Sequence, residues 1–374
     1  MPQLAIRPIP YVNLQQQHAD LKTELLKAVE TVLDSGQFIL GEQVAEFERQ
    51  FAQLCGVDYA VGVNSGTDAL ILALKAAGVA RGDEVITVPN SFVASTTCIR
   101  VLGAKPVFVD VREDYNLDPG QLEAAITPLT KAILPVHLTG RPCDMEPILA
   151  VAQAHGIKVI EDAAQAVLAE YQGQRVGSFG WAGCFSLHPL KNLNACGDGG
   201  VIVTNDPDLY DQLKVLRNIG LKSRDDCVTW SHNSRLDTVQ ASMLLVKLNY
   251  LQDWTEQRRE NARIYQEQLR SLPQTQVPPE QPWERCVYHT FVVQAQQRDQ
   301  LRQYLSDCAI STAIHYPVPI HLCQAGQELG YGPGSFPVVA RQAQQILTLP
   351  MYHGLTPAEI GRVCDTIRAY YAGG

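Results

Sequence analysis

The stretch GCFSLHPLKNLNACGDGGVIVT, residues 183–204, places a glycine-rich loop between two short apolar runs. The runs, Gly183–Leu187 and Gly200–Thr204, have the length and composition of buried strands. The loop between them carries a single lysine, Lys191. Because both runs are apolar throughout, they indicate strands in a sheet that is covered on both faces.

The residues before this stretch repeat the same pattern of short apolar runs. Five earlier runs are of this kind: Tyr59–Val63, Glu84–Val88, Val107–Asp110, Ala132–Val136 and Lys158–Glu161. Helical segments at Asp68–Ala77, Asp144–His155 and Pro207–Leu216 alternate with the runs. The alternation predicts an α/β fold in which helices cover both faces of a mostly parallel, seven-stranded sheet. Such a sheet binds its ligand at the carboxyl ends of its strands.

The last third of the chain changes character. A long helical pattern runs from Asp237 to about Leu269 and breaks at the proline-rich stretch Pro273–Pro282. A strand, a helix, a second strand, a helix and a closing helix are predicted beyond it, with the first three at Thr290–Val293, Asp299–Cys308 and Ser311–Ile314. The closing helix has Thr356 as N-cap, Pro357 at its first position and Glu359 to complete a capping box.

A chain of 374 residues is long enough for two domains. We expect a large domain over residues 1–250, including an N-terminal helical segment, and a smaller α+β domain over residues 251–374. The formal net charge of −9 argues against nucleic acid or an anionic membrane as the main partner. No apolar stretch is long enough to cross a bilayer, and Met1–Pro10 does not resemble a signal peptide.

The 10 cysteines are scattered from Cys55 to Cys364 without a CxxC pair. This spacing is typical of free thiols in a reducing compartment, so the sequence predicts a cytoplasmic protein. A structural zinc site would need paired Cys or His residues at short spacing, and we expect no metal.

Three local patterns point to ligand chemistry, and each has a plainer alternative. Asn64–Thr67 (NSGT) follows a predicted strand and opens a helix, which suits either a phosphate or an ordinary helix cap. Asp162 ends a buried strand, where its carboxylate can hold a protonated pyridine nitrogen or cap the next helix. Lys191 has apolar neighbours that favour its neutral, nucleophilic form, although most lysines in loops are simply solvated.

The order of these patterns along the chain resembles that of the DegT/DnrJ/EryC1/StrS family of sugar aminotransferases. The matching motifs are NSGTDAL (64–70), GDEVITVPNSFVAS (82–95), VIEDAAQA (159–166), GCFSLHPLKNL (183–193), GDGG (197–200), NSRLDTVQA (233–241) and IHYPVPIHL (314–322). The resemblance covers nearly the whole chain. It implies the fold of type I pyridoxal phosphate (PLP) enzymes and an amino transfer.

The resemblance assigns the reactive groups of the cofactor to three residues. Lys191 would carry PLP as a Schiff base and move the proton, and Asp162 would pair with the pyridine nitrogen. Gln165 would contact the phenolic oxygen. The cofactor would alternate between PLP and pyridoxamine phosphate (PMP).

The remaining assignments concern the ring face and the phosphate. Phe92 would stack on the ring, or serve only as a core aromatic. Gly66, Thr67 and Ser186 would hold the phosphate, and Asn233 would reach it from a partner subunit. The resemblance therefore also implies a homodimer with shared sites.

Two positions depart from the family pattern: Thr139 where an aromatic residue is common, and Asn194 where glycine is common. Both leave the cofactor roles unchanged but put the substrate pocket in doubt. His137, His188 and His315 lie in or beside motifs. A structural role is open for each of these histidines, and we assign none of them as a catalyst.

The implied reaction moves an amino group, by resemblance from L-glutamate, to a keto-sugar carried on a nucleoside diphosphate. Inosose-type cyclitols are an open alternative as acceptor. A PLP-dependent sugar dehydratase on the same fold is the first rival, but such relatives can have histidine where this chain has Lys191. A PLP-binding regulator without turnover is the second rival.

Overall fold

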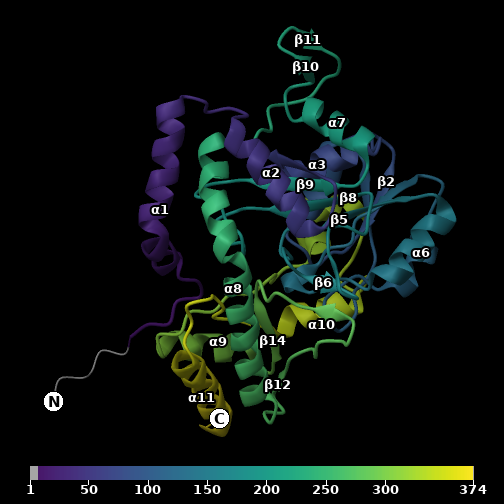
Figure 1. Ribbon diagram of the computed structural model, residues 1–374. Helices are drawn as coiled ribbons and strands as arrows, with labels where there is room; N and C mark the ends of the chain where they lie inside the picture. The colour runs from purple at the N-terminus through teal and green to yellow at the C-terminus, as the bar shows by residue number, and fades with distance from the viewer. Residues whose placement is uncertain (1–6, 374) are drawn as a thin grey trace.

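The computed structural model describes residues 7–373. The sequence predicts no signal peptide in Met1–Pro10, and residues 1–6 of that segment lie outside the described residues. Figure 1 shows a large α/β body, with a smaller group of helices and strands below it in this view. In the described part of the chain, no helix combines the length and apolar character that crossing a membrane requires.

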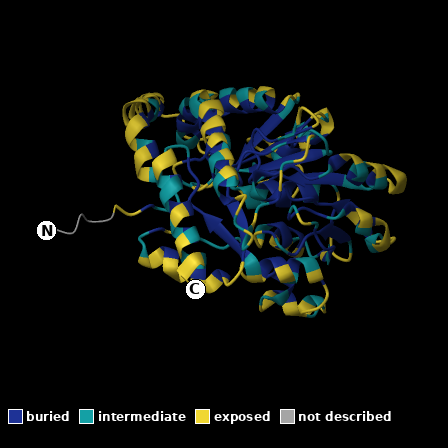
Figure 2. Cartoon of the chain, turned by 90° about the horizontal axis from the view of Figure 1, so that it is seen from below, coloured by how far each residue is buried: buried dark blue, intermediate teal, exposed yellow. Residues whose placement is uncertain are grey.

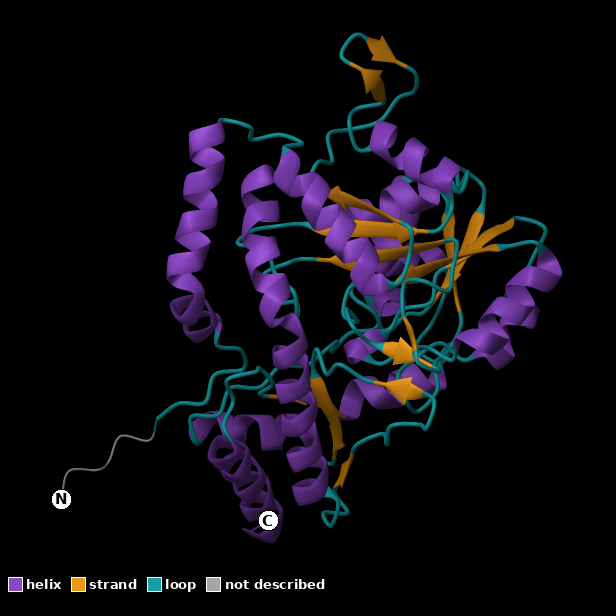
Figure 3. Ribbon diagram, viewed as in Figure 1, coloured by secondary structure: helices purple, strands orange, loops and turns teal. Residues whose placement is uncertain are grey.

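The centre of the molecule is a seven-stranded sheet with the order β1-β9-β8-β5-β4-β2-β3. Its strands are β1 (Tyr59–Val63), β2 (Glu84–Thr87), β3 (Lys105–Phe108), β4 (Thr130–Ile133), β5 (Lys158–Asp162), β8 (Ala182–Ser186) and β9 (Gly200–Thr204). Neighbours from β8 to β3 pair in parallel, whereas β9 is antiparallel to both β1 and β8. The prediction of seven strands in a mostly parallel sheet is confirmed (Figure 3).

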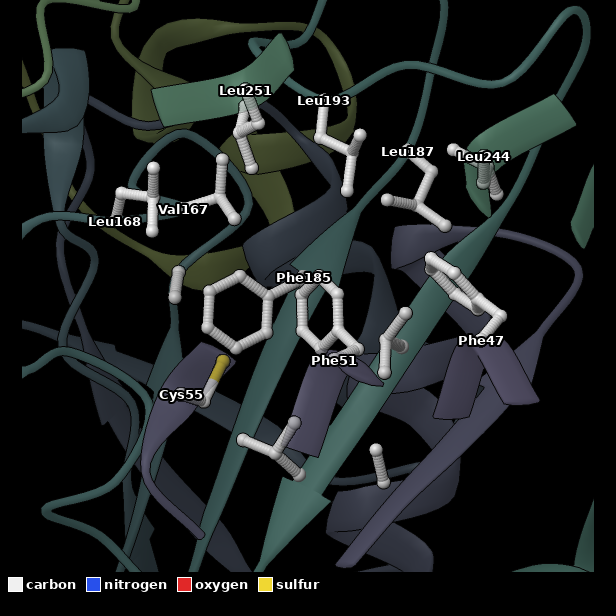
Figure 4. Close-up of a cluster of buried hydrophobic side chains, with 14 of the residues drawn as sticks. Phe47, Phe51, Cys55, Val167, Leu168, Phe185, Leu187, Leu193, Leu244 and Leu251 are labelled. Atoms are coloured by element: carbon white, nitrogen blue, oxygen red, sulfur yellow. The ribbon is translucent and has the colours of Figure 1, made fainter. Parts of the chain in front are cut away.

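Helices cover both faces of this sheet. The covering helices include α2 (Glu42–Cys55), α3 (Gly66–Ala76), α4 (Ala94–Val101), α6 (Met145–His155) and α7 (Pro207–Leu216). Figure 4 shows one face, where Phe51 of α2 meets Phe185 of β8 with ring centroids 5.1 Å apart. Cys184, the neighbour of Phe185, packs on the opposite face with residues of α3 and α7. Alternate residues of a strand therefore belong to different cores, as a doubly covered sheet requires.

Two long helices run beside the sheet. Helix α1 (Leu14–Ser35) lies along α8 (Thr238–Leu269), as Figure 1 shows. The first half of α8 packs against the large body through Leu244 and Leu251. Its second half packs against the smaller unit through Tyr265 and Leu269. Residue 250 thus falls inside a continuous helix, and a domain boundary there stays a prediction.

The smaller unit is built on a three-stranded sheet with the order β12-β14-β15. Its elements are β12 (Thr275–Gln276), β14 (Phe291–Ala295), α9 (Arg298–Asp307), α10 (Pro337–Gln345), β15 (Ile346–Leu349) and α11 (Pro357–Gly373). The predicted capping box of α11 is present, because Glu359 N–H donates to Thr356 Oγ1 and Thr356 N–H donates to Glu359 Oε2. Figure 2 shows that helices at the surface carry the exposed residues, whereas the strands between them are largely buried.

The predicted strand Ser311–Ile314 is wrong. Only Ala313 pairs there, in an isolated bridge with Thr348, and the partner strand β15 (Ile346–Leu349) was not predicted. Ala313 keeps both backbone hydrogen bonds to Thr348, and the pairing ends there because the residues that follow, His315 and Tyr316, turn to line a cavity at the edge of the large sheet.

The remaining elements are short. They are α5 (Leu122–Ala125), the strands β6 (Glu170–Tyr171), β7 (Gln174–Arg175) and β13 (Glu284–Arg285) of a small sheet, and the hairpin β10 (Leu221–Ser223) and β11 (Asp226–Cys227). Four 3-10 turns complete the chain: Pro119–Gln121, Leu138–Gly140, Ile320–Leu322 and Ala325–Leu329. The β10–β11 hairpin projects from the body into solvent (Figure 1).

Candidate active site

A cavity of about 340 Å³ opens at the carboxyl ends of the parallel strands. Strand β1 leads into it through Ser65, β5 through Asp162 and β8 through Ser186. The cavity is lined by residues from five of the sequence motifs: Ser65, Gly66, Thr67, Ser91, Phe92, Ser95, Asp162, Gln165, Ser186, His188, Leu190, Lys191, His315 and Tyr316 are among them. The cavity therefore lies at the edge of the sheet where the sequence predicts ligand binding.

One end of the cavity has the features of an anion site. Ser65 caps α3 by accepting from Asp68 N–H, so the N–H groups of Gly66 and Thr67 precede the first intrahelical bonds. A side chain on Gly66 would place its Cβ only 2.6 Å from Ser186 Cβ, so glycine is needed to bring this turn against β8. A Cβ on Gly200 would lie 2.3 Å from Ser65 O. The reversed strand β9 begins at this glycine and can pass directly under the turn.

Asp162 lies buried at the end of β5. Its Oδ2 accepts from Ser95 Oγ at 2.7 Å, and its Oδ1 accepts from Ala164 N–H at 3.1 Å. Burial raises the pKa of Asp162, and the two hydrogen bonds and the charge of Lys191 oppose that rise. The carboxylate is thus held in a fixed direction in a place where a cationic partner would stabilise its charge.

Lys191 lies in the loop between β8 and β9 and lines the same cavity. Burial lowers the pKa of its amine to about 8, while the charge of Asp162 works in the other direction. A lysine with this pKa has a substantial neutral fraction near neutral pH, which is the form that attacks a carbonyl.

Gln165 is held by two groups that sequence reasoning did not assign. Its Oε1 accepts from Thr139 N–H at 2.8 Å, and its Nε2 donates to Tyr316 Oη at 3.4 Å. Because the oxygen is engaged by the backbone, the amide nitrogen is the end left to serve as a donor. Thr139 has a positive φ of 62°, a conformation that turns its N–H toward Gln165.

Phe92 lines the cavity mouth with 52% of its surface exposed, so the alternative of a core aromatic is not what the structure shows. Its ring centroid lies 5.8 Å from that of Tyr316. An exposed aromatic at a cavity mouth presents a face on which a planar ligand can stack.

Asn233 is the one predicted site residue that does not line the cavity of its own chain. It is exposed and forms an isolated bridge with Asn218 at the base of the β10–β11 hairpin. The other seven predicted residues are brought together by the fold.

The structure adds residues that the sequence reasoning missed. Ser95 and Tyr316 belong to motifs that were recognised, so their position in those motifs was an available signal. His289 comes from outside every motif and lines the cavity because the segment before β14 passes beside it. Burial, with a further contribution from Lys191, lowers the pKa of His289 well below its usual value and that of His315 to about 4.

The three motif histidines separate into two groups. His188 and His315 line the cavity, whereas His137 is buried behind it and contacts Glu161 Oε2 through Nε2 at 3.0 Å. Because His137 Nδ1 accepts from Cys143 N–H, its Nε2 carries the proton that Glu161 accepts. Among the described residues, no three His, Cys, Asp or Glu side chains are grouped to hold a metal ion.

The fold and this cavity define a PLP-dependent aminotransferase of fold type I. The chain belongs to the DegT/DnrJ/EryC1/StrS aminotransferase family, whose model matches residues 19–368. The resemblance seen in the sequence motifs is thereby confirmed.

Two curated relatives illustrate the range of names in this family. The erythromycin biosynthesis sensory transduction protein EryC1 of Saccharopolyspora erythraea is 41% identical over 362 residues, which cover 96% of this chain and 99% of the relative. The dTDP-3-amino-3,4,6-trideoxy-alpha-D-glucose transaminase of Streptomyces venezuelae is 42% identical over 363 residues, covering 97% and 96%. Relatives of this kind place the chain among the sugar aminotransferases.

The same conclusion follows from solved structures. The crystal structure of S. venezuelae DesV in complex with a ketimine intermediate superposes with a TM-score of 0.95 and 42% identity, covering 97% of this chain and 98% of that one. Other similar structures contain the cofactor in its PLP or PMP form.

The residues of this cavity fit that cofactor. A helix N-terminus with two adjacent hydroxyl groups, Thr67 and Ser186, suits a phosphate. A buried carboxylate suits a protonated ring nitrogen, and an amine of lowered pKa suits a carbonyl. The cofactor is PLP.

Proposed function

We propose that the chain transfers an amino group from L-glutamate to a keto-sugar carried on a nucleoside diphosphate, as a step in amino-sugar biosynthesis. The observation that carries this proposal is that Lys191 and Asp162 line one cavity and that their pKa values are shifted in opposite directions. Burial makes the amine of Lys191 less basic and the carboxylic acid of Asp162 less acidic. Groups whose pKa values are tuned in this way inside a cavity are typical of catalytic acids and bases.

PLP, when bound, supplies a carbonyl for the amino group and a ring that takes up electron density from the substrate carbon. Lys191 would be the attachment point, and in each half-reaction its amine would move a proton between the substrate carbon that bears nitrogen and the cofactor carbon. Asp162 keeps the proton on the ring nitrogen, and Ser95 keeps the carboxylate pointed at it.

The other predicted residues bind and orient. Gly66, Thr67 and Ser186 hold the phosphate, and Gln165 donates its amide N–H to the phenolic oxygen. The Thr139 N–H fixes which end of that amide is free. Phe92 covers one face of the ring from the cavity mouth.

The acceptor is inferred from the names of relatives, and the donor from the resemblance to the family. The S. venezuelae transaminase is named for a dTDP-linked amino sugar, which supports a nucleotide-linked keto-hexose as acceptor here. L-glutamate is proposed on the resemblance to the family. Thr139 and Asn194, which depart from the family pattern, lie beside the cofactor residues Gln165 and Lys191, so the particular sugar is proposed only at the level of its class.

We further propose a homodimer in which each site uses residues of both chains. Lys191 is the one lysine or arginine among the described residues that line the cavity. The cofactor phosphate and the sugar diphosphate together carry several negative charges, which one amine does not balance. The projecting segment that includes Asn233 has exposed apolar side chains, with Trp230 87% exposed, as surfaces that contact a second chain commonly do.

The free state of the cysteines supports the predicted compartment. All 10 cysteines are unpaired thiols. Free thiols are maintained in a reducing compartment, which supports the proposal of a cytoplasmic enzyme.

The regulator alternative is favoured by the names of two relatives, the S. erythraea sensory transduction protein and a pleiotropic regulatory protein of Geobacillus stearothermophilus. The presence of Lys191, Asp162 and Gln165 in one cavity counts against it, because a binding protein without turnover needs no poised base. Lys191 also counts against the dehydratase alternative.

Mixing the PLP form with L-glutamate tests the proposal. We expect conversion to PMP, seen as loss of the absorbance of covalently bound PLP, and 2-oxoglutarate in equal amount. The PMP form is then offered a panel of keto-sugar nucleotides, and the acceptor is the one that restores the PLP spectrum. No conversion with glutamate or any other amino donor would contradict transamination, and conversion with a different donor would correct the donor alone.

A further inference from the structure

A buried lysine outside the active site meets an exposed cysteine. Lys247 of α8 is fully buried, and its Nζ donates to Asn194 O at 2.8 Å, to Asn194 Oδ1 at 2.6 Å and to Cys196 Sγ at 3.8 Å. His18 of α1 completes the group, with its Nε2 3.1 Å from Lys247 Nζ and 3.8 Å from Cys196 Sγ. The three side chains come from α1, α8 and the loop that follows Lys191.

Lys247 lacks the partner that buried lysines usually have. Within residues 7–373 no carboxylate lies within ion-pair distance of its Nζ. A buried ammonium without a counter-charge is costly, so the neutral amine gains relative to the charged form. Burial accordingly lowers the pKa of Lys247, and contact with Cys196 opposes the shift. This position therefore favours the neutral amine, the form whose lone pair can attack a sulfur atom, and Cys196 Sγ lies 3.8 Å from Nζ.

Cys196 is placed where a small oxidant can reach it. It is one of two exposed cysteines, with Cys227, and it lines an open cavity of about 490 Å³ beside α1 together with His18, Lys22 and Met243. The sulfur is therefore accessible from solvent, while the amine of Lys247 lies behind it. His18 lies within reach of both atoms and can carry a proton between them.

We propose that Cys196 and Lys247 form a modification site, at which a hydroperoxide produces a covalent sulfur–nitrogen link between the two side chains. The site takes hydrogen peroxide or a small organic hydroperoxide as its co-reactant. It is separate from the cofactor cavity and does not depend on the proposed transamination.

The link forms in two balanced steps. In the first step the Cys196 sulfur attacks the peroxide, the O–O bond breaks, and sulfenic acid and water are formed, so that sulfur loses two electrons and the peroxide gains them. In the second step the lone pair of Lys247 Nζ attacks the sulfenic sulfur, an S–N bond forms, the S–O bond breaks, and water leaves with a proton from nitrogen. The chain loses two hydrogen atoms in total. A thiol reductant reverses the link by adding two electrons and two protons.

The link would reach the active site through Asn194. The side-chain amide of Asn194 donates to Lys191 O at 3.1 Å, and the backbone oxygen and Oδ1 of Asn194 both accept from Lys247 Nζ. When Nζ bonds to the sulfur, the hydrogen bonds that it donates to Asn194 are lost, and these bonds hold Asn194 in place. We expect turnover to fall about fivefold, the factor that loss of one ordinary hydrogen bond at a positioned carbonyl would give.

Peptide mapping of the full-length holoenzyme after mild hydrogen peroxide treatment tests the proposal. Trypsin should release residues 192–214 joined to residues 236–258, because a linked Lys247 is not cleaved. The mass of the pair should equal the sum of the two peptides less two hydrogens. Dithiothreitol should separate the peptides and restore turnover.

Three variants make the result specific. Cys196→Ser should retain turnover and form no link. Lys247→Met, which keeps the buried volume, should stop at a sulfenic acid that dimedone traps on Cys196. Cys227→Ser is the matched control at the other exposed cysteine and should link as the wild type does. The proposal is overturned if peroxide leaves residues 192–214 unlinked in the wild type, or if fragmentation of the joined peptides places an oxygen atom at the link itself and not on Met243.

Discussion

The hydroxyl of Ser95, at the start of α4, donates a 2.7 Å hydrogen bond to the Asp162 carboxylate at the end of β5. Ser91 Oγ lies 2.7 Å from Ser95 Oγ, and since Ser95 donates to Asp162, Ser91 donates to Ser95. Two serines from the motif before α4 thus orient the acid from the motif at β5. The contact joins residues that are 67 positions apart.

Replacing Ser95 by alanine should raise the pKa of Asp162 further, because the bond that opposes the effect of burial is lost. A hydrogen bond to a charged group is worth about 1.5–3 kcal/mol, so PLP affinity and the rate of the glutamate half-reaction should each fall roughly tenfold or more. Equilibrium titration measures the PLP affinity, and stopped-flow absorbance measures the rate of the glutamate half-reaction. Ser91→Ala is the control and should have a smaller effect; equal effects would contradict a direct role of Ser95.

Replacing Asp162 by asparagine should leave cofactor binding in place but slow the proton transfer in both half-reactions. A neutral amide does not keep the ring nitrogen protonated, so the electron-withdrawing power of the ring falls. Single-turnover kinetics with glutamate measure the effect. Unchanged rates would mean that Asp162 is only a cap for the residues that follow β5.

Replacing Lys191 by alanine should abolish the absorbance of covalently bound PLP and stop turnover. The fold should remain intact, because the side chain lies in a loop that lines the cavity and not in the core. Far-ultraviolet circular dichroism and the cofactor spectrum make the comparison. Full turnover in the variant would end the assignment of Lys191.

The lowered pKa of Lys191 also predicts how the stability of the apoprotein depends on pH. Between pH about 8 and the ordinary pKa near 10.5, the unfolded chain binds more protons than the folded one, so this residue makes stability rise with pH. Below pH 8 its burial cost is fully present. At pH 7 the Lys191→Met apoprotein should therefore have a higher free energy of unfolding than the wild-type apoprotein, by at most about 3 kcal/mol, measured by denaturant titration. The difference should shrink as pH rises toward 10, and a difference that grows with pH would contradict the assignment.

Shared sites predict complementation between two inactive or impaired variants. Lys191→Ala and Asn233→Ala proteins are unfolded and refolded together, so that random pairing yields mixed dimers. One site of each mixed dimer then contains an intact Lys191 and an intact Asn233 from the other chain, and activity should exceed the sum of the separate variants. Asn233→Ala alone should weaken PLP retention by roughly 1.5–3 kcal/mol, the value of a hydrogen bond to a charged phosphate.

Light scattering supplies the control for this experiment. A monomer at working concentration, or a mixture no more active than its parts, would contradict shared sites. In that case Asn233→Ala should cost only about 1 kcal/mol of stability, as the loss of a helix cap does.

The sequence alone determined the elements that depend on local pattern. Most residues of the seven strands are apolar, so the strands could be recognised without their neighbours, and Lys191 was placed between β8 and β9 by the runs on either side of it. Gly66, Thr67, Asp162 and Ser186 follow strand ends, and parallel strands bring such ends to one edge. That rule predicted the edge of the sheet at which the cavity lies, whereas the roles of these residues were implied by the family resemblance and most of the lining was identified only in the structure.

Contacts between distant segments were decided only by the tertiary structure. The Thr139 N–H contacts Gln165, Ser95 contacts Asp162, and Lys247 contacts Cys196. Each contact depends on the position in which helices and loops pack on the sheet. The predicted strand Ser311–Ile314 was wrong for a similar reason, since only Ala313 pairs with β15 and the residues that follow line the cavity. A strand or a cap is stabilised by residues close in sequence, whereas these contacts depend on how separate elements pack, which no local pattern records.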